Sequence, residues 1–431
     1  MKDSLGLPLT GASGVSLDAY QRALDQFRCL VGDPAAEAER AITASPAMPM
    51  AHLLKAWLNL LGTDAAAHPV AQAACMAAAR LALDERESLH LKAATHLCEG
   101  QWTAAARVLE DLTIRFPRDL LALQVGHQID YFTGDARMLR DRVARVLPRW
   151  DRGMPGYHAV LGMHAFGLEE TGNYAGAERQ GRLAVELEPR DGWAWHAVAH
   201  VHEMRNEPKS GLEWLGADTV SWSDDSFFAV HNWWHMALFQ LELGDEDEAL
   251  RLYDEAIANG SEVTLDLVDA SAMLWRLQLR GMDLGARWDA VADRWQACGV
   301  PGLYAFNDLH MLMAYIGAGR ESAVQAVLRA LREAVRSGAD NARFTREVGL
   351  PAGAALEAFA QGRFRACADL LRDIRSQAHR FGGSHAQRDL LDLTLLAAAE
   401  RSGQEDLARA LQWERQALRP RSTAGHLALA A

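Results

Sequence analysis

The sequence predicts an all-α protein in which helical hairpins stack into a right-handed superhelix, an α-solenoid. Two observations support this prediction: strand patterns are almost absent, and turn glycines recur along the chain. Consecutive glycines of this set are 34 to 43 residues apart, except for one interval of 72: Gly62, Gly100, Gly134, Gly172, Gly244, Gly281, Gly319, Gly362 and Gly403. Glycine favours the left-handed conformation that ends many helices, so each repeat is interpreted as helix, turn, helix. About ten such hairpins would form one solenoid over residues 1–431.

Helix boundaries support the same repeat. Amphipathic runs rich in Ala and Leu follow most of the glycines, for example ESAVQAVLRALREAV after Gly319. The interval of 72 residues contains the turn 205–208, which divides it into two ordinary repeats. FPRD and EPRD stand 72 residues apart, and in each of them Pro ends a helix while Asp119 or Asp191 is a candidate N-cap.

Two later helices also have candidate N-caps. Ser223 or Asp224 would cap the helix that carries HNWWH, and Ser384 would cap the helix that follows GGS. Short polar side chains at these positions accept hydrogen bonds from the first free N–H groups of a helix. We therefore expect both helices to begin directly after these residues.

The repeat length is typical of tetratricopeptide arrays, in which each hairpin buries the apolar face of its neighbour. The segment TGNYAGAERQGRLAVELEPRD comes closest to that repeat, with Gly172, Tyr174, Ala177, Ala184 and Pro189 in the expected places. Most of the other units are degenerate.

A more particular resemblance covers the central hairpins, residues 150–320. GMHAFGLEETGNYAGAE, DGWAWHAVAHVHEM, HNWWHMALFQLELGDEDEALRLYD and DLVDASAMLWRLQL resemble the tetratricopeptide repeat protein 38 family and its bacterial members. NDLHMLMA and GGSHAQRDLLDL extend the likeness toward the C-terminus. The resemblance implies the α-solenoid fold, but it implies no particular activity.

Composition excludes several classes of partner. The formal net charge is −13 with no basic block, which disfavours nucleic acid and anionic membranes. The five cysteines are scattered without a CxxC pair, so we expect reduced thiols rather than a disulfide framework. The N-terminus lacks the pattern of a signal peptide, and no apolar stretch is long enough to span a membrane. We expect a cytoplasmic protein; its oligomeric state is not predicted.

Histidines concentrate on the first helices of the central hairpins. At the helical angle per residue, His200 lies about 40° from His196 on one side and Glu203 lies about 20° from it on the other. His231 and His235 form a second pair four residues apart on the next hairpin. Such a pair can reach one ion, and an added carboxylate suits zinc, manganese or iron. These five residues are the candidate metal ligands.

Three interpretations of the histidine helices stay open. The first is a divalent metal site, the second is ordinary hydrogen bonding between packed hairpins, and the third is a metal-free site for a polar ligand. The chain lacks HExxH, so the logic of zinc proteases does not carry over. Without a metal, imidazoles oriented by carboxylates could act as acid and base near neutral pH.

A second group of residues would surround this centre. Arg276 lies seven residues after Asp269, on nearly the same helical face, where it could hold a substrate carboxylate or form an ion pair with Asp269 or a neighbouring hairpin. Aromatic walls with a few polar groups are typical of small-molecule pockets. The candidate ligand-binding residues are Arg276, Trp195, Trp233 and Trp234, and the candidate catalytic residues are His158, Glu169, Asp266, Asp269, Asp308 and His310.

Two functions are compatible with these residues. One is a concave pocket lined by His, Asp, Glu and Trp that binds a small polar or carboxylate ligand, with metal-dependent or acid–base hydrolysis as its chemistry. The alternative is a protein–protein interaction scaffold that holds a peptide or helix in its concave groove. Known grooves of that kind use Lys, Arg and Asn, whereas the central helices here offer His, Trp and acids. This difference favours the pocket.

Overall fold

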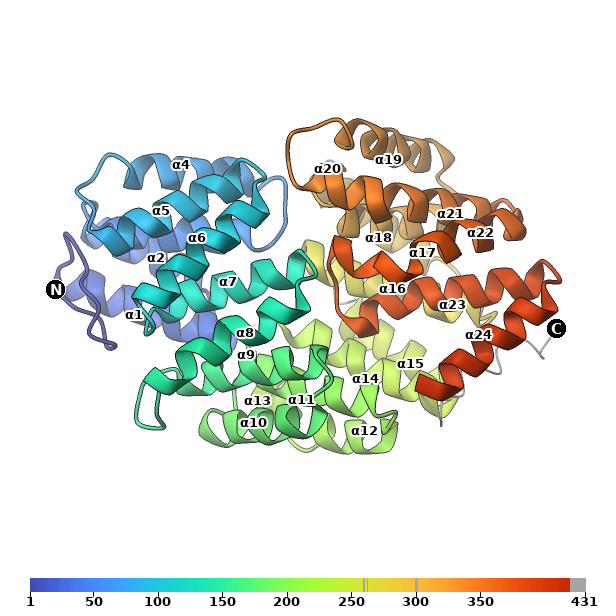
Figure 1. The fold of residues 1–431 in the computed structure, drawn as a ribbon, viewed down its shortest axis with the longest axis horizontal. Coiled ribbons are helices and arrows are strands. Elements are labelled where there is room, and N and C mark those ends of the chain that lie inside the picture. Colours follow the sequence, from blue (N-terminus) through green and yellow to red (C-terminus); the bar gives the residue numbers. More distant parts are fainter. Residues whose placement is uncertain (259, 262, 299–300, 419–431) are drawn as a thin grey trace. The chain divides into compact units, whose positions relative to one another are not determined.

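The computed structural model describes residues 1–418, except 259, 262, 299 and 300. The described residues form helices α1 to α24 and no strand; the only β features are isolated bridges, Lys2 to Pro8 and Val31 to Ser226. Consecutive helices pair as hairpins along the chain (Figure 1). The predicted fold class, an all-α solenoid of helical hairpins, is confirmed.

The chain divides into two compact units. The first comprises residues Met1–Val201 and Asp218–Ala229, and the second comprises His202–Ala217 and Val230–Ala431. Helix α11 (Gly192–Met204) crosses the division, so that His196 and His200 belong to the first unit and His202 and Glu203 to the second. A single right-handed solenoid over residues 1–431 stays a prediction.

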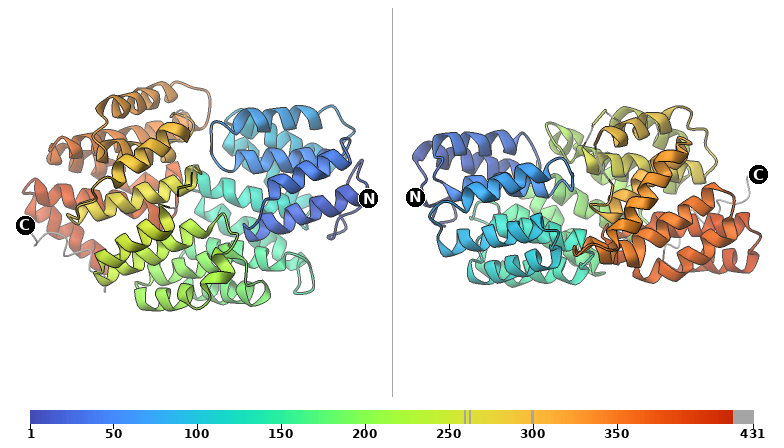
Figure 2. Two further views of the ribbon diagram at one scale, coloured as in Figure 1. Left: turned by 180° about the vertical axis from the view of Figure 1, so that it is seen from behind. Right: turned by 90° about the horizontal axis from the view of Figure 1, so that it is seen from above.

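The first unit contains the helices up to α10, helix α11 as far as Val201, and the short α13. The blue helices of its N-terminal part remain packed on one another in both further views (Figure 2). Its elements before α11 are α1 (Gly14–Cys29), α2 (Pro34–Ala44), α3 (Pro49–Leu60), α4 (His68–Ala78), α5 (Glu85–Cys98), α6 (Trp102–Arg115), α7 (Leu120–Phe132), α8 (Ala136–Val146), the 3-10 turn η1 (Leu147–Arg149), α9 (Tyr157–Glu170) and α10 (Tyr174–Leu187); α13 is Thr219–Ser223.

The second unit contains the remaining helices. Two of its segments, η2 and η3, are wound as π-helix, and η4 is a 3-10 helix. Its elements are α12 (Pro208–Gly216), α14 (Ala229–Leu243, from Val230), α15 (Glu246–Leu252), η2 (Tyr253–Ile257), α16 (Thr264–Leu279), α17 (Arg287–Cys298), α18 (Ala305–Gly317), α19 (Glu321–Ala334), α20 (Asn341–Phe344), η3 (Thr345–Gly349), α21 (Leu350–Ala360), α22 (Phe364–Ile374), η4 (Arg375–Phe381), α23 (His385–Arg401) and α24 (Glu405–Leu418).

The turns lie where the glycine pattern predicts them. All glycines of the set except Gly62 have positive φ; at that turn Thr63 takes the left-handed conformation, with φ 54°. Asn206 does the same in the turn that divides the long interval, with φ 53°. Asn tolerates this region better than most side chains because it can hydrogen-bond locally.

The predicted N-caps are confirmed in three places and wrong in one. Asp119 and Asp191 each accept a hydrogen bond of 3.0 Å from the N–H three residues on, and Ser384 forms a capping box with Gln387. The helix carrying HNWWH does not begin after Ser223 or Asp224. Those residues end α13, a short helix capped by Asp218, and α14 begins only at Ala229.

Small residues let neighbouring helices approach closely. Gly181 on α10 faces Val198 on α11, and a Cβ at this glycine would lie 2.5 Å from the valine Cγ2. Ala177 and Ala184 on the same face of α10 are fully buried. A fully buried Leu, Val or Phe side chain stabilises such an interface by roughly 1.5–3 kcal/mol. The first unit therefore depends on packing that a single added methyl group would disturb.

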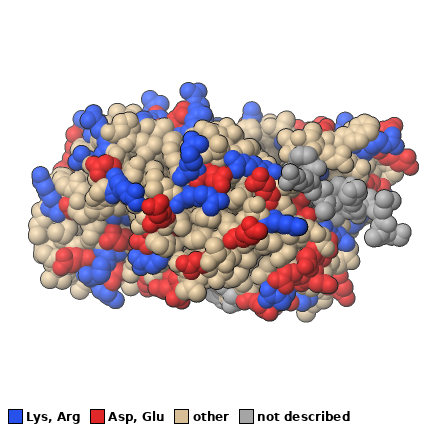
Figure 3. Space-filling view, turned by 90° about the horizontal axis from the view of Figure 1, so that it is seen from below, with Lys and Arg blue, Asp and Glu red and all other residues tan. Residues whose placement is uncertain are grey.

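The described surface mixes charges of both signs. On the face in Figure 3, acidic and basic side chains are interspersed rather than gathered by sign. No described helix combines the length and the apolar composition needed to cross a bilayer. The absence of nucleic acid and membrane partners and the cytoplasmic location stay predictions.

Candidate functional site

A cluster of two carboxylates and an imidazole lies inside the first unit. Glu169 and Glu170 end helix α9, and His200 lies on α11. Donor atoms of these three side chains lie within 4.8 Å of one another. All three are buried, with exposed fractions of 1%, 7% and 0%, respectively. This His/Glu cluster could hold a metal ion.

Aromatic rings cover one side of the cluster. The ring of His200 meets Phe166 edge to face at 5.2 Å, and His196 lies 4.3 Å from His200 between ring centroids. His196 in turn stacks on Phe166 at 5.3 Å and contacts Trp193 and Phe228.

His158 lies apart from this cluster, although the sequence places it on the same face of α9 as Glu169. Eleven residues of helix separate the two side chains by about 16 Å. His158 instead interacts with Asp191, the N-cap of α11, at 2.8 Å. The carboxylate of Asp191 thus caps the start of α11 with one oxygen and interacts with Nδ1 of the His158 imidazole through the other.

Two His–carboxylate pairs lie in the second unit. His231 Nδ1 is 2.7 Å from Asp269 Oδ2, and His235 Nδ1 is 3.2 Å from Glu203 Oε2. The two imidazole centroids are 5.0 Å apart. Burial, followed by the neighbouring His231, lowers the pKa of His235 well below its usual value. The Asp269 carboxylate thus hydrogen-bonds the imidazole of His231, and the Glu203 carboxylate lies beside that of His235.

The other candidate catalytic groups of the second unit occupy separate settings. Asp308 accepts hydrogen bonds from the N–H of Gly302, and burial raises its pKa to about 7. His310 lies 2.8 Å from the Phe306 carbonyl, and burial lowers its pKa to about 4. Burial also raises the pKa of Asp266 to about 6. Among the described hydrogen bonds, neither Asp308 nor Asp266 pairs with a candidate histidine.

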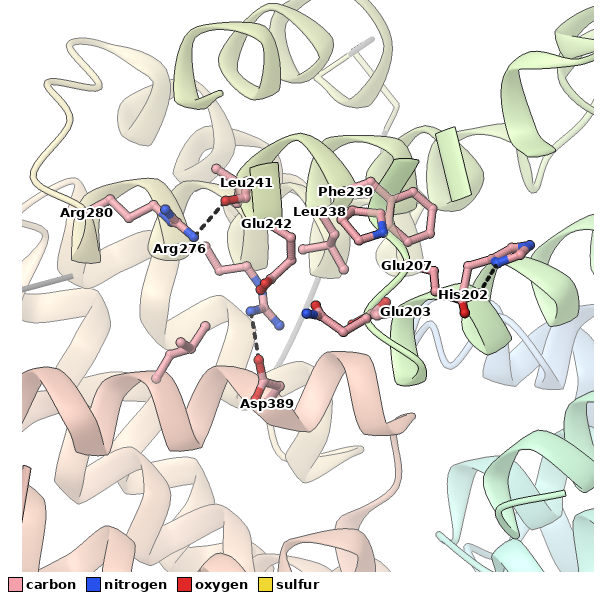
Figure 4. Close-up of a pocket in the computed structure, with 13 residues that line it drawn as sticks. His202, Glu203, Glu207, Leu238, Phe239, Leu241, Glu242, Arg276, Arg280 and Asp389 are labelled. Carbon is pink, nitrogen blue, oxygen red and sulfur yellow. Dashed lines mark hydrogen bonds and ion pairs between the residues drawn. The ribbon is translucent and has the colours of Figure 1, made fainter. Parts of the chain in front are cut away.

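A narrow polar pocket also lies in the second unit (Figure 4). The space open to the centre of a water molecule is about 20 Å³, enough for one or two waters. Polar and charged groups from α11, α14, α16 and α23 line it, together with a few apolar side chains: His202, Glu203, Asn206, Glu207, Pro208, Leu238, Phe239, Leu241, Glu242, Arg276, Arg280, Asp389 and Leu393.

Arg276 is the most deeply buried cation of this pocket, with 5% exposed. It donates to the carbonyl of Ala386 at 2.6 Å, and its guanidinium carbon lies 5.8 Å from the ring of Trp234. Asp389 is 3.6 Å from Arg276, but it receives closer hydrogen bonds of 2.6 and 3.2 Å from Arg415. Helix α23 therefore supplies these two polar contacts of Arg276. An ion pair with a neighbouring hairpin is one of the alternatives that the sequence left open for this residue.

The predicted residues are thus distributed between the units. Of the candidate metal ligands, His196 and His200 lie in the first unit, and Glu203, His231 and His235 lie in the second. Of the tryptophans, Trp195 donates to the Pro189 carbonyl at 2.8 Å, and Trp234 is fully buried beside Arg276 and stacked on His231. Trp233 is half-buried. None of the three tryptophans lines the pocket of Figure 4.

Sequence reasoning missed Glu170 and His127. Helical phase did not indicate Glu170, because it is the residue after Glu169 and therefore points about 100° away from it around the helix. His127 is buried, and burial followed by Arg142 lowers its pKa to about 3; with Gln124 and Gln128 it lines a small cavity beside Trp193. FPRD and EPRD stand 72 residues apart, and the same offset aligns Gln124 and Gln128 with His196 and His200. This alignment could have indicated the surroundings of His127 from the sequence.

No model of a known protein family matches this chain.

Proposed function

We propose that the first unit binds a divalent transition metal, namely zinc, manganese or iron, through Glu169, Glu170 and His200. The observation that supports this proposal is the convergence of three buried donors within 4.8 Å of one another. Mixed imidazole and carboxylate ligands suit these metals. Two neighbouring carboxylates in a buried place repel each other, and a divalent cation between them offsets that cost.

A site of this kind serves a small polar or carboxylate ligand, with hydrolysis as its chemistry. A bound divalent metal would polarise the carbonyl group to be attacked. The Glu169 carboxylate lies 3.5 Å from His200 Nδ1, and the ring of Phe166 packs edge to face against His200. Membership of the tetratricopeptide repeat protein 38 family is part of the proposal, on the motifs of residues 150–320.

Metal analysis of the natively purified chain tests this function. We expect about one transition metal per chain, and His200→Ala or Glu170→Gln should weaken binding at least tenfold, because each removes a direct ligand. The measurement is metal content by elemental analysis, followed by competition with a chromogenic chelator. Circular dichroism of each variant shows whether it is folded.

Matched substitutions outside the cluster serve as controls. His52→Ala on α3 and Glu186→Gln on α10 change the same residue types at more exposed positions of the first unit, and both should retain the metal. A folded wild-type chain without metal that also fails to take up added zinc, manganese or iron would overturn the proposal. So would folded His200→Ala and Glu170→Gln variants that bind as tightly as wild type.

The pocket of the second unit supports a second candidate function, the binding of a carboxylate ligand by Arg276. The specific observation is that Asp389 pairs more closely with Arg415 than with Arg276, at 2.6 Å against 3.6 Å. A ligand carboxylate would compete with Asp389 for this guanidinium and leave the closer Asp389–Arg415 pair intact. Binding requires the narrow pocket to widen beyond its present room for water.

Arg276→Lys should weaken carboxylate binding about tenfold or more, because an ammonium cannot reproduce the planar, two-pronged contact of a guanidinium. The measurement is titration calorimetry with acetate, succinate and N-acetylglycine. Arg287→Lys, on α17 and outside the pocket, is the control and should bind as wild type does. Equal affinities for folded wild type and Arg276→Lys would contradict this function.

A further inference from the structure

A small cavity inside the first unit has a lining that includes no residue of the His/Glu cluster. One face of α7 contributes Gln124, His127 and Gln128, the first turn of α11 contributes Trp193, and α9 contributes Met163. The space open to the centre of a water molecule is about 10 Å³, room for one water. The ring of Trp193 meets His127 edge to face, with 5.8 Å between the centroids. Because Gln128 and Trp193 are partly exposed, the cavity lies just beneath the surface.

Several inaccessible polar atoms around this cavity have no hydrogen-bond partner among the described residues. They are the indole Nε1 of Trp193, the amide Oε1 of Gln128 and both ring nitrogens of His127, a side chain only 1% exposed. The carbonyl of Leu139 lies near His127 without forming a hydrogen bond of regular geometry. A buried polar group costs free energy unless it is paired, so three such residues around one cavity indicate a polar occupant.

The charged groups of the lining already have partners. Arg28 donates to Asp25 at 2.7 Å, and the two oxygens of Asp191 are engaged by the cap of α11 and by His158. Burial lowers the pKa of His127 to about 3, so that its imidazole is neutral at pH 7. The lining therefore carries one positive and one negative charge, which favours an uncharged occupant over an ion of either sign.

We propose that this cavity binds the primary amide group of a small uncharged ligand. The amide carbonyl accepts a hydrogen bond from Trp193 Nε1, and the amide N–H groups donate to Gln128 Oε1 and to the acceptor nitrogen of His127. An indole nitrogen can only donate and an amide oxygen can only accept, so the occupant must supply both an acceptor and a donor. A carboxylate lacks the donor, and a ketone lacks it too. The partly exposed Gln128 side chain rotates to admit a group larger than water.

Titration of acetamide into the chain, isotope-labelled at its tryptophan indole nitrogens, tests the site by NMR spectroscopy. We expect the Trp193 signal, assigned by its loss in Trp193→Phe, to shift and saturate with a dissociation constant in the millimolar range, as suits so small a ligand. Acetate and acetone should bind at least about tenfold more weakly, because neither supplies an N–H group. The response to acetamide should persist in a chelator, which separates this site from the proposed metal site.

Saturation transfer observed on the ligand gives a second readout that does not depend on the Trp193 signal. Trp193→Phe and Gln128→Met should each weaken acetamide binding about tenfold, because each leaves one polar atom of the amide unpaired. Trp150→Phe is the matched control, since this buried tryptophan of the first unit already donates to the Pro117 carbonyl at 2.9 Å. It should bind acetamide as wild type does.

Three outcomes would overturn the proposal. The first is a folded wild-type chain whose Trp193 signal does not respond to acetamide, as expected of a cavity that holds only water. The second is acetamide binding by folded Trp193→Phe and Gln128→Met as tight as that of Trp150→Phe. The third is tighter binding of acetate than of acetamide, which would assign the cavity to an anion.

Discussion

Asp119→Ala is expected to lower the free energy of unfolding by about 3–5 kcal/mol, because it leaves a buried arginine without its counter-charge. Asp119 is 2% exposed and Arg86 is 1% exposed. The carboxylate receives a hydrogen bond of 3.0 Å from Arg86, lies 2.9 Å from His90 Nε2, and caps α7. The measurement is urea unfolding of wild type and variant at pH 7.

Asp135→Ala is the matched control. Asp135 caps α8 through a similar hydrogen bond of 3.0 Å, but it is exposed and has no comparable buried ion pair among the described contacts. Its loss should cost only about 1 kcal/mol. Equal costs for the two substitutions would show that the ion pair around Asp119 contributes no more than its cap.

The cost of Asp119→Ala should also depend on pH. Burial raises the pKa of Asp119, but His90 and Arg86 together lower it more, so that it is held well below its usual range. A depressed carboxyl pKa stabilises the folded state above the unfolded pKa of about 3.9, and this contribution is lost as the pH falls. The difference between wild type and variant should therefore shrink below about pH 4.

Arg142→Met is the second change with a large expected effect, again about 3–5 kcal/mol at pH 7. Arg142 donates two hydrogen bonds to Asp130, of 2.6 and 2.8 Å, and a third to the carbonyl of Ala106 at 3.2 Å. Both side chains of the pair are nearly inaccessible, at 1% and 3%. Methionine fills similar space but leaves the Asp130 carboxylate buried without its partner.

The cost of this variant should also fall with decreasing pH, but in a higher pH range, because the carboxyl pKa involved is raised rather than lowered. Burial raises the pKa of Asp130 to about 6 even beside Arg142, and removal of Arg142 should raise it further. A raised carboxyl pKa favours the folded state at low pH, and that advantage is lost as the pH rises. From pH 7 down to about pH 6, the cost of Arg142→Met should therefore fall by up to about 1.4 kcal/mol per pH unit, and it should level off below the wild-type Asp130 pKa of about 6, where the carboxyl is protonated in both folded proteins.

Arg145→Met separates the effect of burial from that of charge. Arg145 lies one helical turn from Arg142 and pairs with Glu110 at 2.6 Å, but it is only partly buried. Exposed pairs contribute about 0–1 kcal/mol, so this substitution should be nearly neutral at both pH values. If Arg142→Met were as mild as Arg145→Met, or insensitive to pH, the buried pair would contribute little to stability.

These two ion pairs also show why the site was only partly predictable. Both fix α7, whose partner α8 packs on α9, the helix that ends in Glu169 and Glu170. Helical phase assigned Glu169 and His200 to promising faces, and the structure brings them together. Helical phase also puts His158 within about 20° of Glu169 around the same helix, but their separation along the helix axis keeps the two side chains apart. Helical phase gives the direction of a side chain around its own helix. It does not give the position of that side chain along the helix axis or its burial within the packed unit.

The sequence by itself determined the all-α hairpin repeat, most of its turns and three of the four predicted helix starts. These features depend on local chemistry: glycine and asparagine take left-handed turns, and Asp or Ser caps the nearest N–H groups. Only the tertiary structure decided which side chains meet, such as Glu170 with His200, Arg276 with Ala386, or His127 with Trp193. Such contacts depend on how neighbouring helices are rotated and how deeply they pack, which many small side-chain volumes set together rather than any short motif.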